Sequence, residues 1–344
     1  MFPKVSIIIP VYNLENRIEK TLNSILSQSF HDYEIIVVDD CSSDGSAEIV
    51  KMFFMRNPTI CHILLEHDQN KGVSAARNNG IKLASGEYII FWDGDDLANI
   101  NFVSDLYMKA TSDDGIYDIV MSGHTEKNEN NGRKKTYPIP MQLTDGKTPQ
   151  QIACLRIVGK IKTHMCSSIF RKTFIEKCDL RFHEGCIAGE DIEFIIKSLV
   201  RSNSTGLLEK NDYIYIVHDK KDIIDNFDSR LEKIKKYSDN TMGHMRTTEY
   251  ISEFAEDKDL FFVNDHILLP QMLQREISLL AIKNDHIAFC KKIKDKNTRK
   301  ILWSSFKSII IKAEVFLKSL LLLLFPKLYY IYYSKRYVKI NRKF

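Results

Sequence analysis

The sequence predicts an α/β protein with a mostly parallel sheet, because three features of its first 125 residues agree. Short β-branched, apolar runs alternate with segments whose apolar residues recur at helical spacing. Two of the apolar runs end in carboxylates, at residues 39–40 and 93–96. Alternating strands and helices form a parallel sheet that binds ligands at the carboxyl ends of its strands. The fold class therefore also predicts where a site lies.

The expected elements follow one another in a regular order. Strands are predicted at residues 5–11, 34–38, 63–65, 88–92 and 118–121. Helices are predicted at residues 14–28, from 43 or 44 to about 54, at 73–84 and around 102–110. The polar, turn-rich stretch 127–147 indicates a surface excursion, and Thr148-Pro149 begins a further helix. A second block, residues 163–217, contains an apolar segment at 166–170, a helix beginning at 189–191 and a strand at 213–217.

Composition limits the class of protein. The 344 residues are 44% hydrophobic and 27% charged, as in an ordinary globular chain, which excludes a disordered one. We expect a nucleotide-binding domain at 1–220 with a Rossmann-like sheet, a mainly helical extension at 221–295 and a basic, amphipathic tail at 296–344. Seven scattered cysteines without a Cys-x-x-Cys pair indicate neither a zinc site nor a disulfide framework, and favour the reducing cytoplasm.

Three carboxylates lie within four residues, at Asp93, Asp95 and Asp96, directly after an apolar run. So many negative oxygens in one loop are tolerated when water or a hard divalent cation shares the site. Mn²⁺ and Mg²⁺ prefer carboxylate oxygen and bind substrate phosphates as well, which predicts a metal-bound nucleotide diphosphate. A solvated acidic turn is the alternative interpretation of these residues alone.

Three further motifs precede the acidic cluster and one follows it. They are VSIIIPVYN at residues 5–13, VVDDCSSDG at 37–45, NKGVSAARNNG at 70–80, and Gly189-Glu190-Asp191. Together with the cluster, this order resembles glycosyltransferase family 2, a group of inverting enzymes with the GT-A fold. The resemblance covers residues 3–220. It implies metal-dependent transfer of a sugar from a nucleotide diphosphate sugar, UDP-linked, to a saccharide or lipid-linked acceptor of a bacterial surface glycan such as lipopolysaccharide or capsule.

The resemblance also implies a set of residues that bind the nucleotide sugar. These are Pro10, Tyr12, Asp40, Gly72, Arg77, Asp93 and Asp95. Tyr12 would stack on a pyrimidine and Asp40 would accept a hydrogen bond from a ring N–H. The planar guanidinium of Arg77 would suit the phosphate oxygens. The residues alone leave other roles open. Tyr12 would then be a core aromatic, Asp40 a helix cap or part of a solvated turn, and Arg77 a solvated side chain.

The expected metal ligands are Asp95, Asp96 and His218, although the sequence does not separate the roles of the two aspartates. Asp191 is the expected catalytic base, because an inverting displacement needs a carboxylate that takes the proton from the acceptor hydroxyl. Glu190 would orient neighbouring groups or cap the helix that contains Asp191. The alternatives are an ordinary acidic helix start for Asp191 and a surface position at a strand end for His218.

Charge is distributed unevenly along the chain. Residues 296–344 contain twelve Lys or Arg and one acid, Glu314, for a net charge of +11, whereas residues 1–295 carry −7. Apolar residues at helical spacing from 301 to 325 predict an amphipathic helix, but its longest uncharged stretch, 319–326, is too short to span a bilayer. We expect this tail to bind an anionic membrane, at the inner face of the plasma membrane, rather than nucleic acid. A core helix and a homo-oligomer interface are the alternatives.

Two other functions compete with glycosyl transfer. A nucleotidyltransferase would have a glycine-rich, basic loop after the first strand, whereas this chain has Tyr12-Asn13-Leu14-Glu15. A catalytically inactive, membrane-bound scaffold would have no need of the intact carboxylates at 93–96 and 191.

Overall fold

The computed structural model describes residues 2–112, 115–218, 229–283, 285–305 and 313–339. The chain forms two compact units. Unit 1 comprises residues 1–152, 161–186 and 190–223, and unit 2 comprises residues 153–160, 187–189 and 224–344. The helical extension and the basic tail, which we expected as separate parts, fall in one unit.

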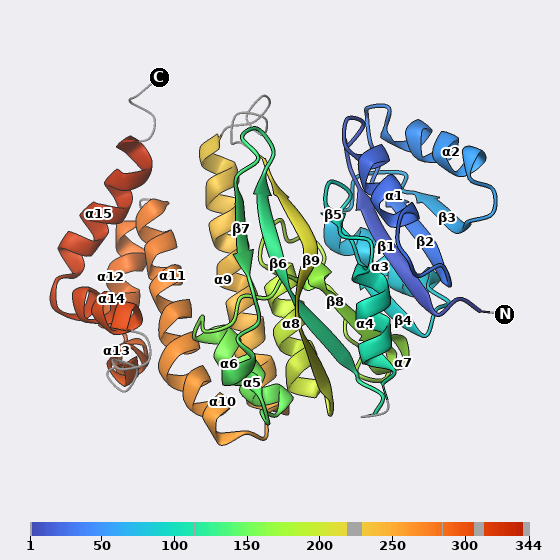
Figure 1. Cartoon of the computed structure of the whole chain (residues 1–344). Coiled ribbons are helices and arrows are strands. Elements are labelled where there is room, and N and C mark those ends of the chain that lie inside the picture. The colour runs from blue at the N-terminus through green and yellow to red at the C-terminus, as the bar shows by residue number, and fades with distance from the viewer. Residues whose placement is uncertain (1, 113–114, 219–228, 284, 306–312, 340–344) are drawn as a thin grey trace. The chain divides into compact units, whose positions relative to one another are not determined.

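Unit 1 begins with four parallel strands in the order β3-β2-β1-β4 (Figure 1). These are β1 (Val5–Val11), β2 (Tyr33–Asp39), β3 (Cys61–Glu66) and β4 (Tyr88–Phe91). The connecting helices are α1 (Ile18–Leu26), α2 (Ser46–Arg56) and α3 (Val73–Leu83). Because crossovers are right-handed and the direction of travel reverses after β3, α3 lies on the face opposite α1 and α2. The α/β fold class is confirmed.

The second half of the sheet is mixed, unlike the mostly parallel sheet that we expected. It contains β5 (Leu97–Ala98), β6 (Ile119–Asn128), β7 (Lys134–Tyr137), β8 (Ser168–Arg171) and β9 (Thr205–Val217). β8 is inserted antiparallel between β4 and β6, β9 runs parallel to β6, and β7 pairs antiparallel with β6. The stretch at 127–147 is therefore only partly an excursion, since β6 continues into it and β7 and α5 (Met141–Thr144) lie within it.

The remaining helices of this region are α4 (Phe102–Ala110), α6 (Pro149–Ile157), η1 (Met165–Ser167), α7 (Lys172–Lys177) and α8 (Glu190–Arg201).

Aromatic packing holds α8, the helix at the last sequence motif, in place. The ring of Phe194 on α8 lies 5.6 Å from that of Phe91 on β4 and stacks on Phe182 at 4.1 Å. All three side chains are buried. Their packing holds the start of α8 near the end of β4, where the acidic cluster begins.

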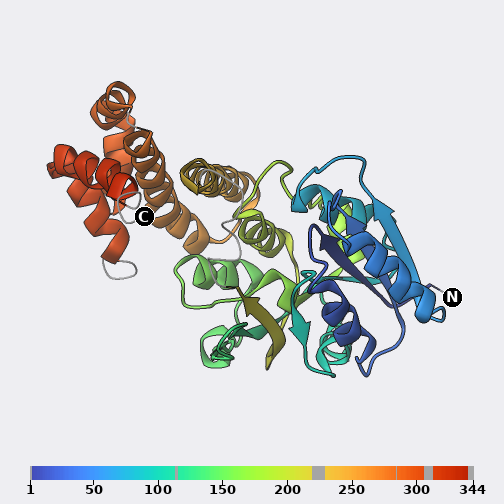
Figure 2. The same cartoon turned by 90° about the horizontal axis from the view of Figure 1, so that it is seen from above.

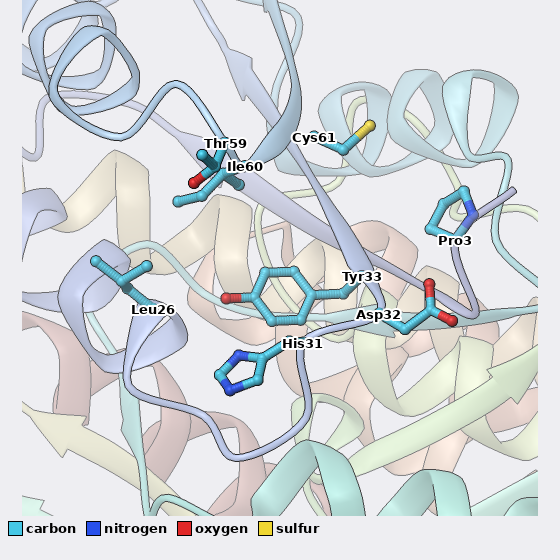
Figure 3. A pocket seen from close by; sticks show the side chains of 8 residues that line it. All are labelled: Pro3, Leu26, His31, Asp32, Tyr33, Thr59, Ile60 and Cys61. Carbon is cyan, nitrogen blue, oxygen red and sulfur yellow. The ribbon is translucent and has the colours of Figure 1, made fainter. Parts of the chain in front are cut away.

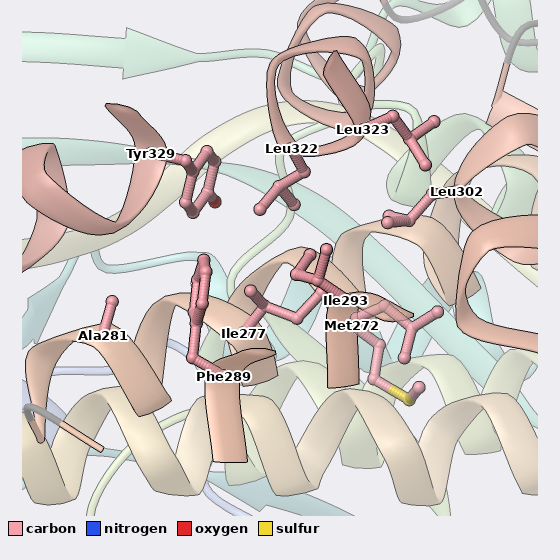
Figure 4. Close-up of a cluster of buried hydrophobic side chains, with 10 residues drawn as sticks. Met272, Ile277, Ala281, Phe289, Ile293, Leu302, Leu322, Leu323 and Tyr329 are labelled. Carbon is pink, nitrogen blue, oxygen red and sulfur yellow. The ribbon is translucent and has the colours of Figure 1, made fainter. Parts of the chain in front are cut away.

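Unit 2 is helical (Figure 2). Its helices are α9 (Ser229–Phe254), α10 (Lys258–Val263), η2 (Asn264–Leu268), α11 (Leu269–Ile282), α12 (His286–Lys294), α13 (Lys296–Ser304), α14 (Ala313–Leu324) and α15 (Pro326–Lys339). Asp257, Asp285 and Asp295 cap α10, α12 and α13 by accepting hydrogen bonds from backbone N–H groups. Figure 4 shows the apolar core, where Ile277, Phe289 and Leu322 meet from three different helices.

The tail helices α14 and α15 pack on this core through one face. Gln274 on α11 donates from Nε2 to the carbonyl of Val315 at 2.7 Å and to Ser319 Oγ at 2.8 Å. The hydroxyls of Ser278 and Tyr329 lie 2.7 Å apart. No single helix of the described residues is long and apolar enough to cross a bilayer, and one pair, Glu314–Leu324 with Pro326–Tyr333, reaches that length only with a 111° bend. Residues 306–312 and 340–344, part of the predicted tail helix and basic end, lie outside the described residues.

Candidate active site

The acidic cluster forms a tight turn between β4 and β5. Thr21 Oγ1 donates to the carbonyls of Gly94 and Asp96, both at 3.0 Å, and Trp92 Nε1 donates to the Asp96 carbonyl at 3.1 Å. A Cβ on Gly94 would lie 3.0 Å from the backbone oxygen of Pro10, so glycine lets the turn approach the end of β1. The turn is thereby held at the carboxyl end of the parallel strands, where the fold predicts a ligand site.

Asp96 lies inside the protein rather than at the surface of this turn. Its Oδ2 accepts from the Tyr213 hydroxyl and its Oδ1 from the backbone N–H of Ile216, both at 2.7 Å. Burial, and then repulsion by Asp93 and Asp95, raises the pKa of Asp96 well above its usual value. Both oxygens therefore accept a hydrogen bond from β9, and the role of Asp96 as a metal ligand stays a prediction. Its geometry suits a residue that positions the turn against β9.

Asp95 and His218 lie together at the edge of the sheet. His218 Nε2 is 2.8 Å from Asp95 Oδ2, and its Nδ1 is 2.6 Å from Glu129 Oε2. Glu129 also pairs with Arg17 at 3.4 Å. Burial, followed by the nearby Asp93 charge, raises the pKa of Asp95, whereas the hydrogen bond from His218 lowers that of Glu129. Two of the three expected metal ligands are thus neighbours.

Arg77 connects two motifs that are over 90 residues apart in the sequence. From α3, its Nη2 contacts Asp93 Oδ1 at 2.8 Å and its Nη1 contacts Glu190 Oε1 at 3.0 Å. The guanidinium is buried and lies 5.2 Å from the Phe182 ring. Burial opposes ionisation of Asp93, but Arg77 outweighs it and the pKa of Asp93 lies below its usual value. Burial dominates at Glu190 and raises its pKa. Within the protein the partners of Arg77 are therefore carboxylates, and its role in binding the donor phosphates stays a prediction.

Asp40, at the end of β2, organises the loop that precedes α3. Its Oδ1 accepts from the Lys71 N–H at 2.8 Å and faces His67 Nδ1 at 2.7 Å, and its Oδ2 accepts from the Gly72 N–H at 2.7 Å. Gly72 adopts φ +88°, a conformation that glycine allows without strain. The side chain of Asp40 is buried, so its first role is to shape the Lys71-Gly72 turn.

The remaining donor-binding candidates lie at the end of β1. Pro10 is within this buried strand, and Tyr12, which follows it, is exposed. Asn13 has a positive φ of 53°, and its Oδ1 accepts from the Ser43 N–H at 2.8 Å. This contact joins the first and second sequence motifs beside an accessible aromatic ring.

Asp191 lies in the first turn of α8, directly after Glu190. It is only partly buried, and no donor from the described residues forms a hydrogen bond with its carboxylate. Through Glu190 and Arg77, the start of α8 is tied to Asp93. The residue that precedes Asp191 is thus joined to the acidic cluster, although the two are far apart in the sequence.

A pocket of about 420 Å³ lies elsewhere in unit 1 (Figure 3). It is lined by Pro3, Leu26, His31, Asp32, Tyr33, Thr59, Ile60 and Cys61. These residues surround the points where β1, β2 and β3 begin. Since α/β sheets bind their ligands at the opposite edge, we do not assign the site here.

Several residues that shape the site were not predicted. Glu129 lies in the polar stretch that we interpreted as surface, Tyr213 opens a segment that looked like an ordinary strand, and His67 follows a predicted strand without a motif of its own. The only sequence signal was indirect: a buried carboxylate needs donors, and hydroxyl and imidazole groups near strand ends can supply them.

The comparison with protein families identifies the chain. Residues 6–176 match the family model described as Glycosyl transferase family 2. The chain belongs to glycosyltransferase family 2. It is 33% identical over 220 residues to the uncharacterized glycosyltransferase EpsJ of Bacillus subtilis, an alignment that covers 62% of this chain and 61% of EpsJ. The alignment therefore spans less than two thirds of each protein.

Solved structures show the same fold. A TM-score of 0.61 at 23% identity relates the chain to residues 1–349 of Staphylococcus aureus TarS in complex with UDP-GlcNAc, covering 99% of this chain and 92% of that chain. The mannosyltransferase PcManGT of Pyrobaculum calidifontis, in complex with GDP-Man and Mn²⁺, gives a TM-score of 0.52 at 14% identity, covering 95% and 88%. The poly(ribitol-phosphate) β-N-acetylglucosaminyltransferase TarS is 29% identical over 215 residues, 62% of this chain and 35% of full-length TarS. The GT-A fold is thereby shown.

Proposed function

We propose that this family member is a metal-dependent, inverting glycosyltransferase. It moves a sugar from a nucleotide diphosphate sugar, UDP-linked, to a saccharide or lipid-linked acceptor of a bacterial surface glycan such as lipopolysaccharide or capsule. The observation that supports this most is the Arg77 bridge, which brings Asp93 of the acidic turn to the helix start that contains Asp191. We infer that the donor site and the base lie at the same edge of the sheet.

The nucleotide would bind where the first two motifs meet. The exposed ring of Tyr12 offers a face on which a pyrimidine can stack. Asp40 Oδ2 has the Gly72 N–H as its only donor among the described residues, and a carboxylate oxygen can accept a second hydrogen bond. A uracil N–H would supply it. The TarS complex with UDP-GlcNAc, a protein of the same fold, supports a UDP-linked donor.

The residues present fit a cation that is shared with substrate. Among the described residues no three His, Cys, Asp or Glu side chains gather as a complete metal site. Asp95 and His218 offer one oxygen and one nitrogen at the same point, and Glu129 is placed to orient the His218 ring. Mn²⁺ and Mg²⁺ often take only one or two protein ligands and complete their shell with phosphates and water. When bound, such an ion stabilises the charge on the departing diphosphate.

The chain's own residues would supply the remaining chemistry. Asp191 accepts the proton from the acceptor hydroxyl as that oxygen attacks the anomeric carbon from the face opposite the diphosphate. Glu190, held by Arg77, fixes the start of α8 and so positions Asp191. Asp96 fixes the turn that presents Asp93 and Asp95 to the donor. A single displacement of this kind inverts the configuration at the anomeric carbon.

Donor binding is expected to depend on the cation and on Asp95. UDP-GlcNAc should raise the melting temperature of the protein when Mn²⁺ is present and much less in excess chelator, because a ligand that binds only the native state stabilises it. In Asp95→Asn the Mn²⁺-dependent part of the shift should disappear. A thermal-shift series with UDP-GlcNAc, UDP and GDP-mannose measures both effects.

Glu176→Gln is the matched control for this series. Glu176 lies on α7, after the end of β8 that is beside the start of β4, so its loss of charge occurs at the opposite edge of the sheet. The control should keep the full Mn²⁺-dependent shift. Equal stabilisation by the nucleotide sugar with and without chelator would contradict metal dependence.

We also propose that unit 2 binds an anionic membrane surface, the inner face of the plasma membrane. Leu322 and Leu323 of α14 face the core of unit 2. Other apolar side chains of α14 and α15 are exposed. This outer face consists of Leu317, Leu321, Leu324, Phe325, Leu328, Ile331 and Tyr332. The spacing of Leu317, Leu321 and Leu324 places them on one side of α14. An apolar face within a segment of net charge +11 is typical of a helix that lies on anionic lipid.

Polar substitution on the outer face should weaken lipid binding. Leu317, Leu324 and Leu328 are 59%, 53% and 60% exposed, so replacing all three with glutamine leaves the core intact. We expect at least about ten-fold weaker partitioning onto phosphatidylglycerol vesicles, because each leucine contributes apolar burial on insertion. Cosedimentation with vesicles measures this. The control is Met52→Gln with Met55→Gln, two exposed apolar residues of α2.

Equal binding by the triple variant and the wild type would contradict a membrane role for this face. A homo-oligomer that uses the same face would appear instead as a larger particle in size-exclusion chromatography without lipid, and the triple variant would dissociate it.

A further inference from the structure

Two lysines from different segments each lie against the same aromatic ring in unit 1. Lys135 lies on β7 and Lys162 lies just before η1. Each ammonium nitrogen is 5.0 Å from the centre of the Tyr137 ring. Two like charges beside one ring repel each other, although the electron-rich face of the ring attracts both. Such a pair is favourable when an anion lies between or beside the two ammonium groups.

The acids near these lysines are engaged by other groups. Glu126, which is opposite Lys135 in the β6–β7 register, accepts a hydrogen bond from the Tyr137 hydroxyl at 3.1 Å. Glu129 is bound by His218 and Arg17. Neighbouring Arg133 and Lys134 are also exposed cations, so the positive charges here outnumber Glu126 and Glu129. The local charge is therefore positive and open to solvent.

A series of ring contacts connects this lysine pair to the acidic turn. Tyr137 stacks on His124 at 4.9 Å, and His124 lies 5.6 Å from His164. His164 in turn stacks on Tyr213 at 5.5 Å, and the Tyr213 hydroxyl binds Asp96. The lysine pair thus belongs to the same part of the sheet as the acidic turn, at the end of a short path of rings.

Tyr215 extends this surface toward the acidic turn. Its ring lies 5.0 Å from that of His164 and it is only partly buried. Burial, and then the negative charges of Asp96, Asp93 and Asp95, raises its pKa to about 12. The apolar faces of sugar rings pack well on aromatic rings of this kind. A glycan lying on Tyr215 and His164 would reach Lys135 and Lys162 with a neighbouring residue.

We propose that Lys135 and Lys162 form a binding site for an anionic group, a phosphate or a carboxylate, on the acceptor glycan. The inference rests on the proposed function, because it treats β6, β7 and β9 as the acceptor side of a glycosyltransferase. The substrate class that it names is an acidic glycan whose negative charge lies one or more residues from the hydroxyl that reacts. The site selects such acceptors over neutral ones and steers them by charge.

The test measures acceptor binding without a donor. Isothermal titration calorimetry compares a short polyol-phosphate oligomer, an oligomer of glucuronic acid and a neutral malto-oligosaccharide. The wild type should bind at least one of the two acidic oligomers more tightly than the neutral one, and which oligomer it prefers distinguishes phosphate from carboxylate. In the double variant Lys135→Gln with Lys162→Gln this affinity should fall about ten-fold, while Lys135→Arg with Lys162→Arg should retain it. Increasing salt should weaken wild-type binding.

The matched control removes two charges at the opposite edge of the sheet. Lys82 lies near the end of α3, just before β4 begins, and Lys177 lies at the end of α7. Lys82→Gln with Lys177→Gln changes the net charge equally and should leave the affinity unchanged. An equal loss in this control, equal affinity for acidic and neutral oligomers, or no binding of either acidic oligomer would overturn the inference.

Failure of this inference is distinguishable from failure of the proposed function. The Mn²⁺-dependent shift with UDP-GlcNAc, measured on the same lysine variants, reports the donor site alone. If that shift persists while the lysines have no effect on oligomer binding, the transferase assignment stands and the anionic site does not.

Discussion

Replacement of Asp191 by asparagine is expected to lower the rate of sugar transfer by about 10² to 10⁴ while nucleotide-sugar affinity stays unchanged. Asparagine has nearly the same shape but does not accept a proton at neutral pH. The side chain is partly exposed at the start of α8, and no described residue donates a hydrogen bond to it. Its loss therefore removes a reactive group rather than a structural one. Initial rates of transfer and calorimetric donor affinity separate the two.

The control addresses the helix start. Glu48 is an exposed acid in the first turn of α2, so Glu48→Gln removes a comparable interaction with a helix dipole, of about 0.3 to 1 kcal/mol. It should leave both the rate and the affinity unchanged. If Asp191→Asn lowers donor affinity as much as it lowers the rate, Asp191 holds the helix start and is not the base.

Replacement of Arg77 by alanine is expected to destabilise unit 1 by about 3 to 5 kcal/mol. The guanidinium is buried between Asp93 and Glu190, and its removal leaves the buried Glu190 and the partly buried Asp93 without their cation. The desolvation cost of these charges remains, but the attraction that offset it is lost. Urea unfolding of the full chain, followed by a signal from unit 1 such as the fluorescence of the buried Trp92, measures the change.

Two further variants separate the causes of this loss. Arg56 on α2 pairs with Glu19 at 2.7 Å, but both side chains are about half exposed, so Arg56→Ala should cost no more than about 1 kcal/mol. Adding Glu190→Gln to Arg77→Ala should restore part of the stability, because one unpaired charge is removed. A similar small loss in Arg77→Ala and Arg56→Ala would show that the bridge contributes little to stability.

Much of the fold could be predicted because local patterns determine it. The helix at Phe102–Ala110 agrees with the prediction at both ends, and the strands at the start of the chain differ by few residues. Apolar periodicity is strong in these segments because each faces the core. The strand β7 was missed because Lys134, Lys135 and Thr136 are polar and the strand pairs only with β6. The insertion of β8 between β4 and β6 depends on pairing between distant segments, which local patterns do not reveal.

The site was predictable in its motifs but not in its contacts. Nothing in the sequence Asp-Gly-Asp-Asp distinguishes Asp95, which faces His218, from Asp96, which is buried against Tyr213. The difference arises because β9 passes one side of the turn, and β9 is more than 100 residues away in the sequence. The same holds for Arg77, whose carboxylate partners come from two other motifs. The motifs predict the residue types, while tertiary packing decides which oxygen each group contacts.

The configuration of the transferred sugar tests the central claim most directly. With an α-linked UDP-sugar that the protein binds in the Mn²⁺ series, and an acceptor glycan that takes up the sugar, NMR spectroscopy of the purified product reports the anomeric configuration of the new bond. A single displacement assisted by Asp191 predicts a β-linked product and no covalent sugar on the enzyme. An α-linked product, formed with retention, would contradict the account.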